Sequence, residues 1–393
     1  MASMMATSMP SANNYNNNNN TSDDDNTAPT SYFQTHETIQ IVDVDKKKCI
    51  FHIYSSNLYN NEKRLTECPI FVFVHGGGFS AMTFAQVAKI CTENNIPILA
   101  FDLYGHGKFE YASNVNHRSS DSIDKFKLPY LEESNFSIDR FTDDVVQILS
   151  LTLKTEKLNI VGCDNESPSL PRIILIGHSM GGAIATHVTR QAPERLNHIL
   201  QISGLVVVDV VEGTALAALP SMEQYIQEIP KEFRTLEDAI KHVCKTMLQK
   251  ISPTSYDTIK ASVRSRLKFI QKENVYRWRT NLVDTMPYWA GWYTGMSRYF
   301  LDTGVGNKIK KLLIVAGMDR LDTPLTIAHM QGKFQYKNIP NSGHVIHEEN
   351  PSIFYDLLVD FCKVQGLFTS NKEALDLKIQ NAWTNREDNK CKK

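Results

Sequence analysis

The sequence lacks the features that mark membrane-embedded, secreted, disulfide-rich or nucleic-acid-binding proteins. No apolar run approaches the roughly 20 residues of a membrane-spanning helix, and no apolar secretory signal follows the N-terminus. Its seven cysteines are scattered from Cys49 to Cys391 without C-x-x-C spacing, which argues against a disulfide framework and a zinc site. The net charge is −1, from 42 basic and 43 acidic residues, so the protein has no excess of positive charge that would attract nucleic acid or a membrane surface. We expect an intracellular protein that binds neither nucleic acid nor a membrane. Its expected location is the cytoplasm, with the nucleus as the alternative.

The two ends of the 393-residue chain differ in composition from its middle. Residues 1–35 hold an asparagine-rich stretch and an acidic run, with little that could form a core, so we expect a disordered leader. Residues 371–393 are expected to form a charged, poorly ordered tail. The stretch between them, residues 36–370, exceeds one typical core and suggests a catalytic domain with an inserted subdomain.

Apolar, strand-like runs alternate with helix-like stretches through the middle of the chain. The runs are Pro69–Val74, Ile96–Phe101, Ile173–Ile176, Gly204–Val211 and Leu312–Val315, preceded by a half-buried hairpin at Thr38–Val44 and Cys49–Tyr54. This alternation predicts an α/β fold with a mostly parallel central sheet and helices on both faces. The polar segment 111–135 is expected to be a long surface loop.

The pentapeptide Gly177-His178-Ser179-Met180-Gly181 follows one of these strand-like runs directly. It has the G-x-S-x-G pattern of a strand that turns sharply into a helix and exposes a serine hydroxyl on the turn. Only small residues fit beside such a turn, and Gly177 and Gly181 meet that demand. The pattern predicts an α/β-hydrolase fold in which Ser179 is the nucleophile.

A serine nucleophile needs hydrogen-bond donors for the oxyanion that forms on the substrate. The sequence His75-Gly76-Gly77-Gly78 ends another strand-like run, and glycines there let backbone N–H groups approach a developing negative charge. We therefore expect Gly77, Gly78 and the amide of Met180 to form the oxyanion hole.

The serine also needs a base and an orienting acid, which follow it in the chain order Ser, acid, His. Among the twelve histidines, His344 lies in the loop-like stretch Asn341-Ser342-Gly343-His344 near the end of the fold and is the expected base. Two acids compete. Asp209 lies in an apolar run, where a carboxylate is costly unless it is hydrogen-bonded, and Asp319 follows the seventh expected strand. Spacing alone does not choose between them, whereas Asp322 has a structural use near the start of a helix, beside Thr323 as its expected N-cap.

Residues 212–308 interrupt the strand–helix alternation. They contain helix-like stretches at Leu236–Gln249 and Tyr256–Gln271 and the aromatic cluster Tyr288–Tyr293. α/β hydrolases carry a cap over the active site at this point, so we predict a helical cap insertion after the sixth strand. The aromatic cluster is a candidate partner surface, although tryptophans at such spacing more often belong to a core.

Several motifs resemble those of the protein phosphatase methylesterase family, in matching order from about Pro69 to the 350s. The motifs are Ile176–Ala185, Val208–Ala215, Tyr288–Trp292, Asp319–Asp322 and Met330–Gln335. The second and the last are much narrower than the general hydrolase pattern. The resemblance implies Asp209 as the triad acid, no metal and no organic cofactor. It also implies, as substrate and partner, the protein phosphatase 2A catalytic subunit, whose C-terminal leucine methyl ester would be hydrolysed, and it implies an inhibitory complex with that phosphatase.

Two other functions stay open from the sequence. One is a carboxylesterase for small esters, which would use the same triad. The other is a non-catalytic protein that binds the phosphatase and inhibits it, against which the intact Ser, His and Asp set argues.

Overall fold

The computed structural model describes residues 29–43, 47–59, 65, 67–111, 135–155, 157–158, 170–247, 253–303, 309–317 and 321–368. Most of the expected leader, the whole charged tail and nearly all of the expected 111–135 loop lie outside the described residues. Asp319 also lies outside them.

Among the described residues, nine strands form one sheet, with β5 attached to β2 and the others in the order β1-β2-β4-β3-β6-β7-β11-β12. The strands are β1 Thr35–Val42, β2 Lys48–Ser56, β3 Ile70–Val74, β4 Ile98–Phe101, β5 Glu110–Tyr111, β6 Arg172–His178, β7 Gln201–Val208, β11 Lys310–Val315 and β12 Gln335–Asn338. Neighbours from β4 to β12 run parallel, whereas β1, β2 and β5 pair antiparallel. The predicted mostly parallel sheet is confirmed.

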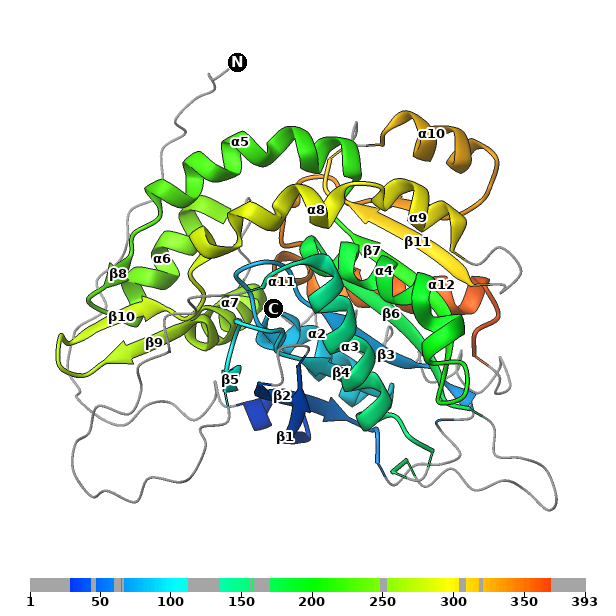
Figure 1. The fold of residues 1–393 in the computed structure, drawn as a ribbon, viewed down its shortest axis with the longest axis horizontal. Coiled ribbons are helices and arrows are strands. Elements are labelled where there is room, and N and C mark those ends of the chain that lie inside the picture. Colours follow the sequence, from blue (N-terminus) through cyan, green and yellow to red (C-terminus); the bar gives the residue numbers. More distant parts are fainter. Residues whose placement is uncertain are drawn as a thin grey trace, which may run out of the picture.

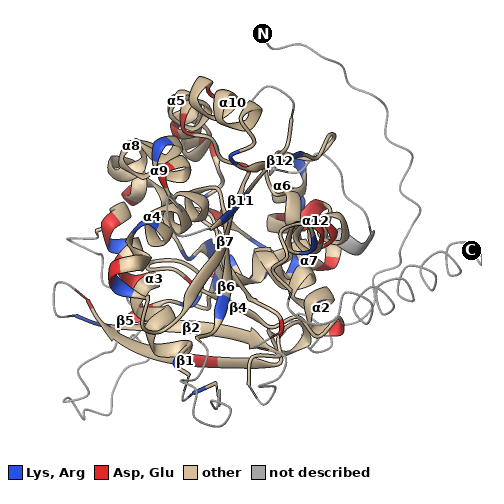
Figure 2. Cartoon of the chain, turned by 90° about the vertical axis from the view of Figure 1, so that its right-hand side faces the viewer, with Lys and Arg blue, Asp and Glu red and all other residues tan. Residues whose placement is uncertain are grey.

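Helices cover both faces of this sheet (Figure 2). α3 (Ile138–Thr152) and α4 (Met180–Arg195) lie on one face, and α2 (Ala85–Glu93) and α12 (Pro351–Val364) lie on the other. Short helical segments occur at η2 Pro29–Ser31, η3 Ala81–Phe84, η4 Leu282–Tyr288 and α11 Ile346–Glu349. Lys and Arg positions alternate with Asp and Glu positions along the chain in Figure 2, in keeping with the balanced composition.

Successive side chains of the central strands point to opposite faces of the sheet and contribute to a hydrophobic core on each face. In β3, Ile70, Val72 and Val74 belong to the cluster under α3 and α4, whereas Phe71 and Phe73 belong to the cluster under α2 and α12. All five are fully buried. A strand buried on both faces has no polar side to show, which is why it is a continuous apolar run in the sequence.

The chain between β7 and β11 forms a mixed layer along one side of the molecule (Figure 1). It holds α5 Glu212–Glu228, α6 Leu236–Met247, α7 Pro253–Arg266, α8 Trp289–Tyr293 and α9 Met296–Asp302, with strands β8 Glu232–Phe233, β9 Leu267–Ile270 and β10 Val275–Trp278. The expected helix Tyr256–Gln271 is wrong at its end, because β9 pairs with β10 from Leu267 onward. Beyond β11, α10 spans Thr323–Met330. Its N-cap is Asp322, whose carboxylate accepts from the N–H of Leu325, not the expected Thr323.

The aromatic cluster Tyr288–Tyr293 packs inward, so its interpretation as a partner surface is wrong. Trp289 and Trp292 are buried in the same core cluster as the apolar residues of α4. Their indole N–H groups donate to Thr285 Oγ1 at 2.8 Å and to the Phe136 carbonyl at 2.7 Å. A buried indole needs such a partner, and these two bonds hold α8 in place.

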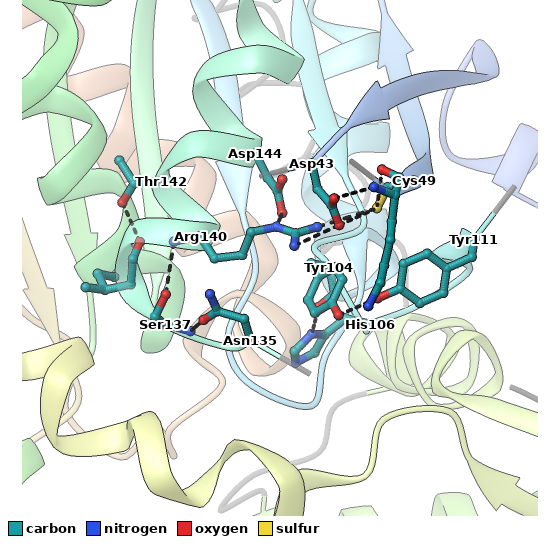
Figure 3. Close-up of polar contacts among 12 residues, drawn as sticks. Asp43, Cys49, Tyr104, His106, Tyr111, Asn135, Ser137, Arg140, Thr142 and Asp144 are labelled. Atoms are coloured by element: carbon teal, nitrogen blue, oxygen red, sulfur yellow. Dashed lines mark hydrogen bonds and ion pairs between the residues drawn. The ribbon is translucent and has the colours of Figure 1, made fainter. Parts of the chain in front are cut away.

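A buried ion-pair network joins the N-terminal hairpin to α3 (Figure 3). Arg140 contacts Asp43 at 3.1 Å and Asp144 at 2.8 Å, and its guanidinium lies 4.1 Å from the ring centre of Tyr104. The Cys49 thiol lies beside the guanidinium, and burial raises its pKa to about 12. This thiol therefore stays protonated and is a structural group.

Candidate active site

Ser179 occupies the sharp turn between β6 and α4. Its φ and ψ are 53° and −122°, a conformation that non-glycine residues rarely adopt and that is typical of strained functional turns. The Ser179 N–H donates to the Val208 carbonyl at 2.9 Å, which anchors the turn to β7. A Cβ atom at Gly177 would lie 2.1 Å from the Gly181 carbonyl oxygen, so the two glycines allow the turn to close, as the sequence predicts.

His344 and Asp209 meet at the carboxyl ends of the parallel strands, where Ser179 also lies. His344 Nδ1 lies 2.6 Å from Asp209 Oδ2, and the His344 side chain is 40% exposed whereas that of Asp209 is fully buried. The other carboxylate oxygen of Asp209 accepts from the Ala316 N–H at 2.8 Å. A buried carboxylate that holds one ring nitrogen fixes the imidazole tautomer and leaves the other nitrogen to act on the serine.

Asp209 follows β7 rather than lying inside a strand. The strand expected at Gly204–Val211 is Gln201–Val208, and Asp209 leaves it with φ of 52° while its N–H donates to the Ile314 carbonyl at 2.7 Å. Asp209 is thus held by backbone bonds to Ile314 of β11 through its N–H and to Ala316, just after β11, through its carboxylate. The alternative acid, Asp319, lies outside the described residues, and Asp322 caps α10.

The buried His178 and Glu349 support the loop that carries His344, a role that sequence reasoning missed. His178 Nε2 contacts the His344 carbonyl at 2.8 Å, and the two rings lie 4.7 Å apart. Burial lowers the pKa of His178 well below its usual value, so the ring is neutral and donates this bond. The Glu349 carboxylate on α11 accepts from the Gly343 N–H at 2.9 Å. The loop that carries His344 is therefore fixed from two sides.

The glycine turn after β3 lies against the serine turn. A Cβ atom at Gly76 would lie 3.2 Å from Ser179 Cβ, and one at Gly77 would lie 3.7 Å from Met180 Sδ. Gly78 has φ of 79°, in the region that favours glycine. Met180 is the first residue of α4, so its N–H has no partner within the helix. The structure thus brings Gly76 and Gly77 against Ser179 and Met180, whereas the nearest side chain to Gly78 is that of Leu282.

His75, the first residue of that turn, is structural. Its ring is fully buried, contacts the Gly76 carbonyl at 2.8 Å and accepts from the Leu103 N–H at 3.0 Å. Burial lowers the pKa of His75 well below its usual value, so a neutral ring with one donor and one acceptor nitrogen matches both bonds.

Tyr293, at the end of α8, is buried, and burial raises the pKa of its phenol to about 12. Within the described part of the chain, no hydrogen bond joins Ser179 to His344.

The residues that the structure describes contain no group of three or more His, Cys, Asp or Glu side chains placed to hold a metal ion. No helix among them is both long and apolar enough to cross a bilayer.

The chain matches known proteins in sequence and in fold. The alpha/beta hydrolase family model matches residues 71–357. Protein phosphatase methylesterase 1 of Schizosaccharomyces pombe is 34% identical over 295 residues, which cover 74% of this chain and 74% of that protein. The Bos taurus protein of the same name is 31% identical over 374 residues, with 85% and 86% covered.

Solved structures agree on the fold. The chain superimposes on E-2-(acetamidomethylene)succinate hydrolase with a TM-score of 0.55 at 13% identity, covering 84% of this chain and 100% of that one. For a thioesterase domain from the curacin biosynthetic pathway, the TM-score is 0.52 at 17% identity, with 83% and 99% covered. With the family match over most of the chain, the protein belongs to the protein phosphatase methylesterase 1 family of α/β hydrolases and is a carboxylic ester hydrolase.

Proposed function

We propose that this hydrolase removes the methyl group from the C-terminal leucine methyl ester of the protein phosphatase 2A catalytic subunit. The 2.6 Å contact between His344 and a fully buried Asp209, at the sheet edge that carries the strained Ser179, is the observation that carries the proposal. The family to which the chain belongs supplies the substrate class, since its members are named for a phosphatase methyl ester.

In the first step, Ser179 Oγ attacks the ester carbonyl carbon while His344 Nε2 takes the hydroxyl proton. The carbonyl π electrons move to oxygen, which becomes an oxyanion next to the N–H groups of Met180 and of Gly77 or Gly78. The oxyanion then re-forms the carbonyl, the C–O bond to the methoxy group breaks, and protonated His344 gives its proton to the departing methanol.

In the second step, water attacks the acyl-enzyme with His344 again as the base, and Ser179 leaves with the proton. Asp209 keeps Nδ1 of the imidazole protonated and stabilises its charged form in both steps. None of these steps calls on a metal or an organic cofactor. The phosphatase is both substrate and partner, and we place the reaction in the cytoplasm, with the nucleus as the alternative.

The test is methanol release from methylated phosphatase 2A core enzyme by the wild-type chain and by Ser179→Ala. We expect release by the wild type and loss of most of it in the variant, with unchanged folding. A pull-down of the phosphatase by Ser179→Ala separates binding from turnover. Binding without release by either protein would indicate a phosphatase-binding inhibitor, and cleavage of small esters alone would indicate a general carboxylesterase.

A further inference from the structure

The buried side chain of Thr83 joins two segments that are far apart along the chain. Thr83 lies in η3 and is fully buried. Its hydroxyl donates to the Glu348 carboxylate and lies 2.9 Å from His347 Nε2, and both partners belong to α11. Glu348 and His347 are also fully buried. Hydrogen bonds sheltered from water are electrostatically stronger than exposed ones, so this contact ties η3 firmly to α11.

Both segments adjoin groups on which the proposed reaction depends. η3 begins at Ala81, shortly after Gly78 ends the glycine turn. α11 begins at Ile346, and His344 lies just ahead of it. Thr83 therefore connects the turn that is expected to supply oxyanion donors to the loop that carries the base.

The η3 side of this link is fixed by a buried carboxylate. Asp102 accepts from the Ala81 N–H at 2.8 Å and from the Lys108 N–H at 2.9 Å. The Tyr54 hydroxyl also donates to Asp102, at 3.1 Å. Three donors leave this carboxylate little freedom to move, so η3 is a rigid support for Thr83.

On the α11 side, the link continues to His344 itself. The His347 ring lies 4.7 Å from the ring of His178, edge to face, and His178 Nε2 donates to the His344 carbonyl at 2.8 Å. Glu349 on α11 accepts from the Gly343 N–H at 2.9 Å. A shift of α11 would therefore displace the loop that holds the imidazole.

The contact depends on a hydroxyl, because both of its partners are polar and buried. A hydroxyl has one hydrogen, which Thr83 gives to Glu348, and lone pairs that accept from an N–H. Burial lowers the pKa of His347 to about 3, so this ring is neutral and its N–H lies on the nitrogen that faces Thr83. A methyl group in place of the hydroxyl would leave both partners unpaired, which is costly in a buried position.

We propose that Thr83 is a positioning residue, whose hydroxyl sets the place of the His344 loop relative to the glycine turn. This inference rests on the acyl transfer proposed above. The base and the oxyanion donors act on the same ester group, so the reaction depends on their relative position. Because Thr83 is fully buried, its hydroxyl does not contact the substrate, and it should act on kcat rather than on KM.

The test measures kcat and KM of Thr83→Val and Thr83→Ser on methylated phosphatase 2A core enzyme. The same variants are assayed on p-nitrophenyl acetate, which reports acyl transfer without the phosphatase. Valine keeps the size of the side chain and removes the hydroxyl, so we expect kcat to fall by about 10–10²-fold on both substrates, with KM within about twofold. Thr83→Ser keeps the hydroxyl and should stay within about threefold of the wild type.

Thr189→Val is the matched control. Thr189 is a buried threonine on α4 whose hydroxyl donates to the Ala185 carbonyl of its own helix at 2.7 Å. This variant should have the kcat of the wild type, because the lost bond joins no two elements of the site.

The rank order of the two Thr83 variants distinguishes positioning from packing. If Thr83 only filled space, Thr83→Val would be active, and Thr83→Ser, which leaves a methyl-sized gap, would be the impaired variant. That order, wild-type kcat in Thr83→Val, or a rise in KM alone would overturn the inference.

His347→Phe breaks the same link from its other end and covers the case in which Thr83→Val does not fold. Phenylalanine keeps a ring against Phe84 and removes the nitrogen that faces Thr83. It should lower kcat by about 10-fold, and the double variant should be no slower than Thr83→Val alone, because both changes break one link. Wild-type kcat in His347→Phe, or multiplied losses in the double variant, would overturn the inference.

The two substrates keep the failure of this inference distinct from that of the proposed function. If the wild type cleaves p-nitrophenyl acetate but releases no methanol from the phosphatase, the proposed function fails. The Thr83 variants then still decide the positioning role on the small ester.

Discussion

The backbone conformations of Ser179 and Asp209 matter as much as their side chains. Both have positive φ, at 53° and 52°, and both donate an N–H bond to a neighbouring strand. Non-glycine residues adopt this conformation at a cost that the surrounding structure must offset. Two such residues lie at the carboxyl ends of neighbouring strands, and one of them, Asp209, is bonded to His344. This arrangement favours a functional explanation for both strained backbone conformations.

Asp209→Asn tests the choice of acid at the residue scale. Asparagine keeps the size of the side chain but does not stabilise the charged imidazole or hold its tautomer, so we expect kcat to fall by about 10³–10⁴-fold. Asp319→Asn is the matched control and should stay within about threefold of the wild type. Steady-state methanol release measures both. The reverse pattern would transfer the acid role to Asp319.

Gly177→Ala tests how tightly the serine turn closes. The added Cβ would lie 2.1 Å from a backbone carbonyl oxygen that cannot move away, so we expect a loss of at least about 3 kcal/mol in the free energy of unfolding. Gly291→Ala in α8 meets nothing within 4 Å and should raise stability by roughly 0.5–1 kcal/mol, because alanine favours a helix. Urea denaturation measures both, and a mild effect at Gly177 would contradict the geometry.

At the scale of elements, the sequence predicted best those segments whose apolar pattern reflects burial. The strands β3 and β6 were predicted because they are buried on both faces and are each followed by a glycine-containing turn. The helix expected over Tyr256–Gln271 ends early because Leu267–Ile270 pairs with β10, a strand that follows it in the chain. Local sequence propensity carries no information about such a pairing partner.

Glu212 links α5 to α9, and the effect of this link on stability can be measured. Its carboxylate at the start of α5 accepts two backbone N–H groups at the start of α9, which is the arrangement of a helix cap supplied from another helix. We expect Glu212→Ala to lower the free energy of unfolding by about 1–2 kcal/mol. Glu223→Ala, on the exposed part of α5, should change it by less than about 0.5 kcal/mol. Thermal or urea unfolding would show the contrast, and equal effects would argue against the cap.

At the scale of the whole molecule, buried neutral histidines should make the fold sensitive to acid. Burial lowers the pKa of His75 and His178, that of His106 to about 4 and that of His347 to about 3. The unfolded chain binds protons at these histidines near pH 6.5, whereas the folded chain does not. Stability should therefore be full above about pH 7 and fall below it, by up to about 1.4 kcal/mol per pH unit for each histidine.

Urea denaturation between pH 8 and pH 5 measures this dependence. His106→Asn should give a shallower decline, because one fewer buried imidazole must take up a proton, whereas replacement of the exposed His198 by Asn should leave the slope unchanged. A stability that is constant over this range would contradict the neutral state of the buried histidines.

The measurement that tests the central claim most directly is hydrolysis of methylated phosphatase 2A core enzyme in ¹⁸O-labelled water, with mass analysis of both products. Acyl transfer through Ser179 breaks the bond between the carbonyl carbon and the methoxy oxygen. It predicts one ¹⁸O in the leucine carboxylate, unlabelled methanol and no reaction with Ser179→Ala. Label in the methanol, or undiminished turnover by Ser179→Ala, would contradict the account.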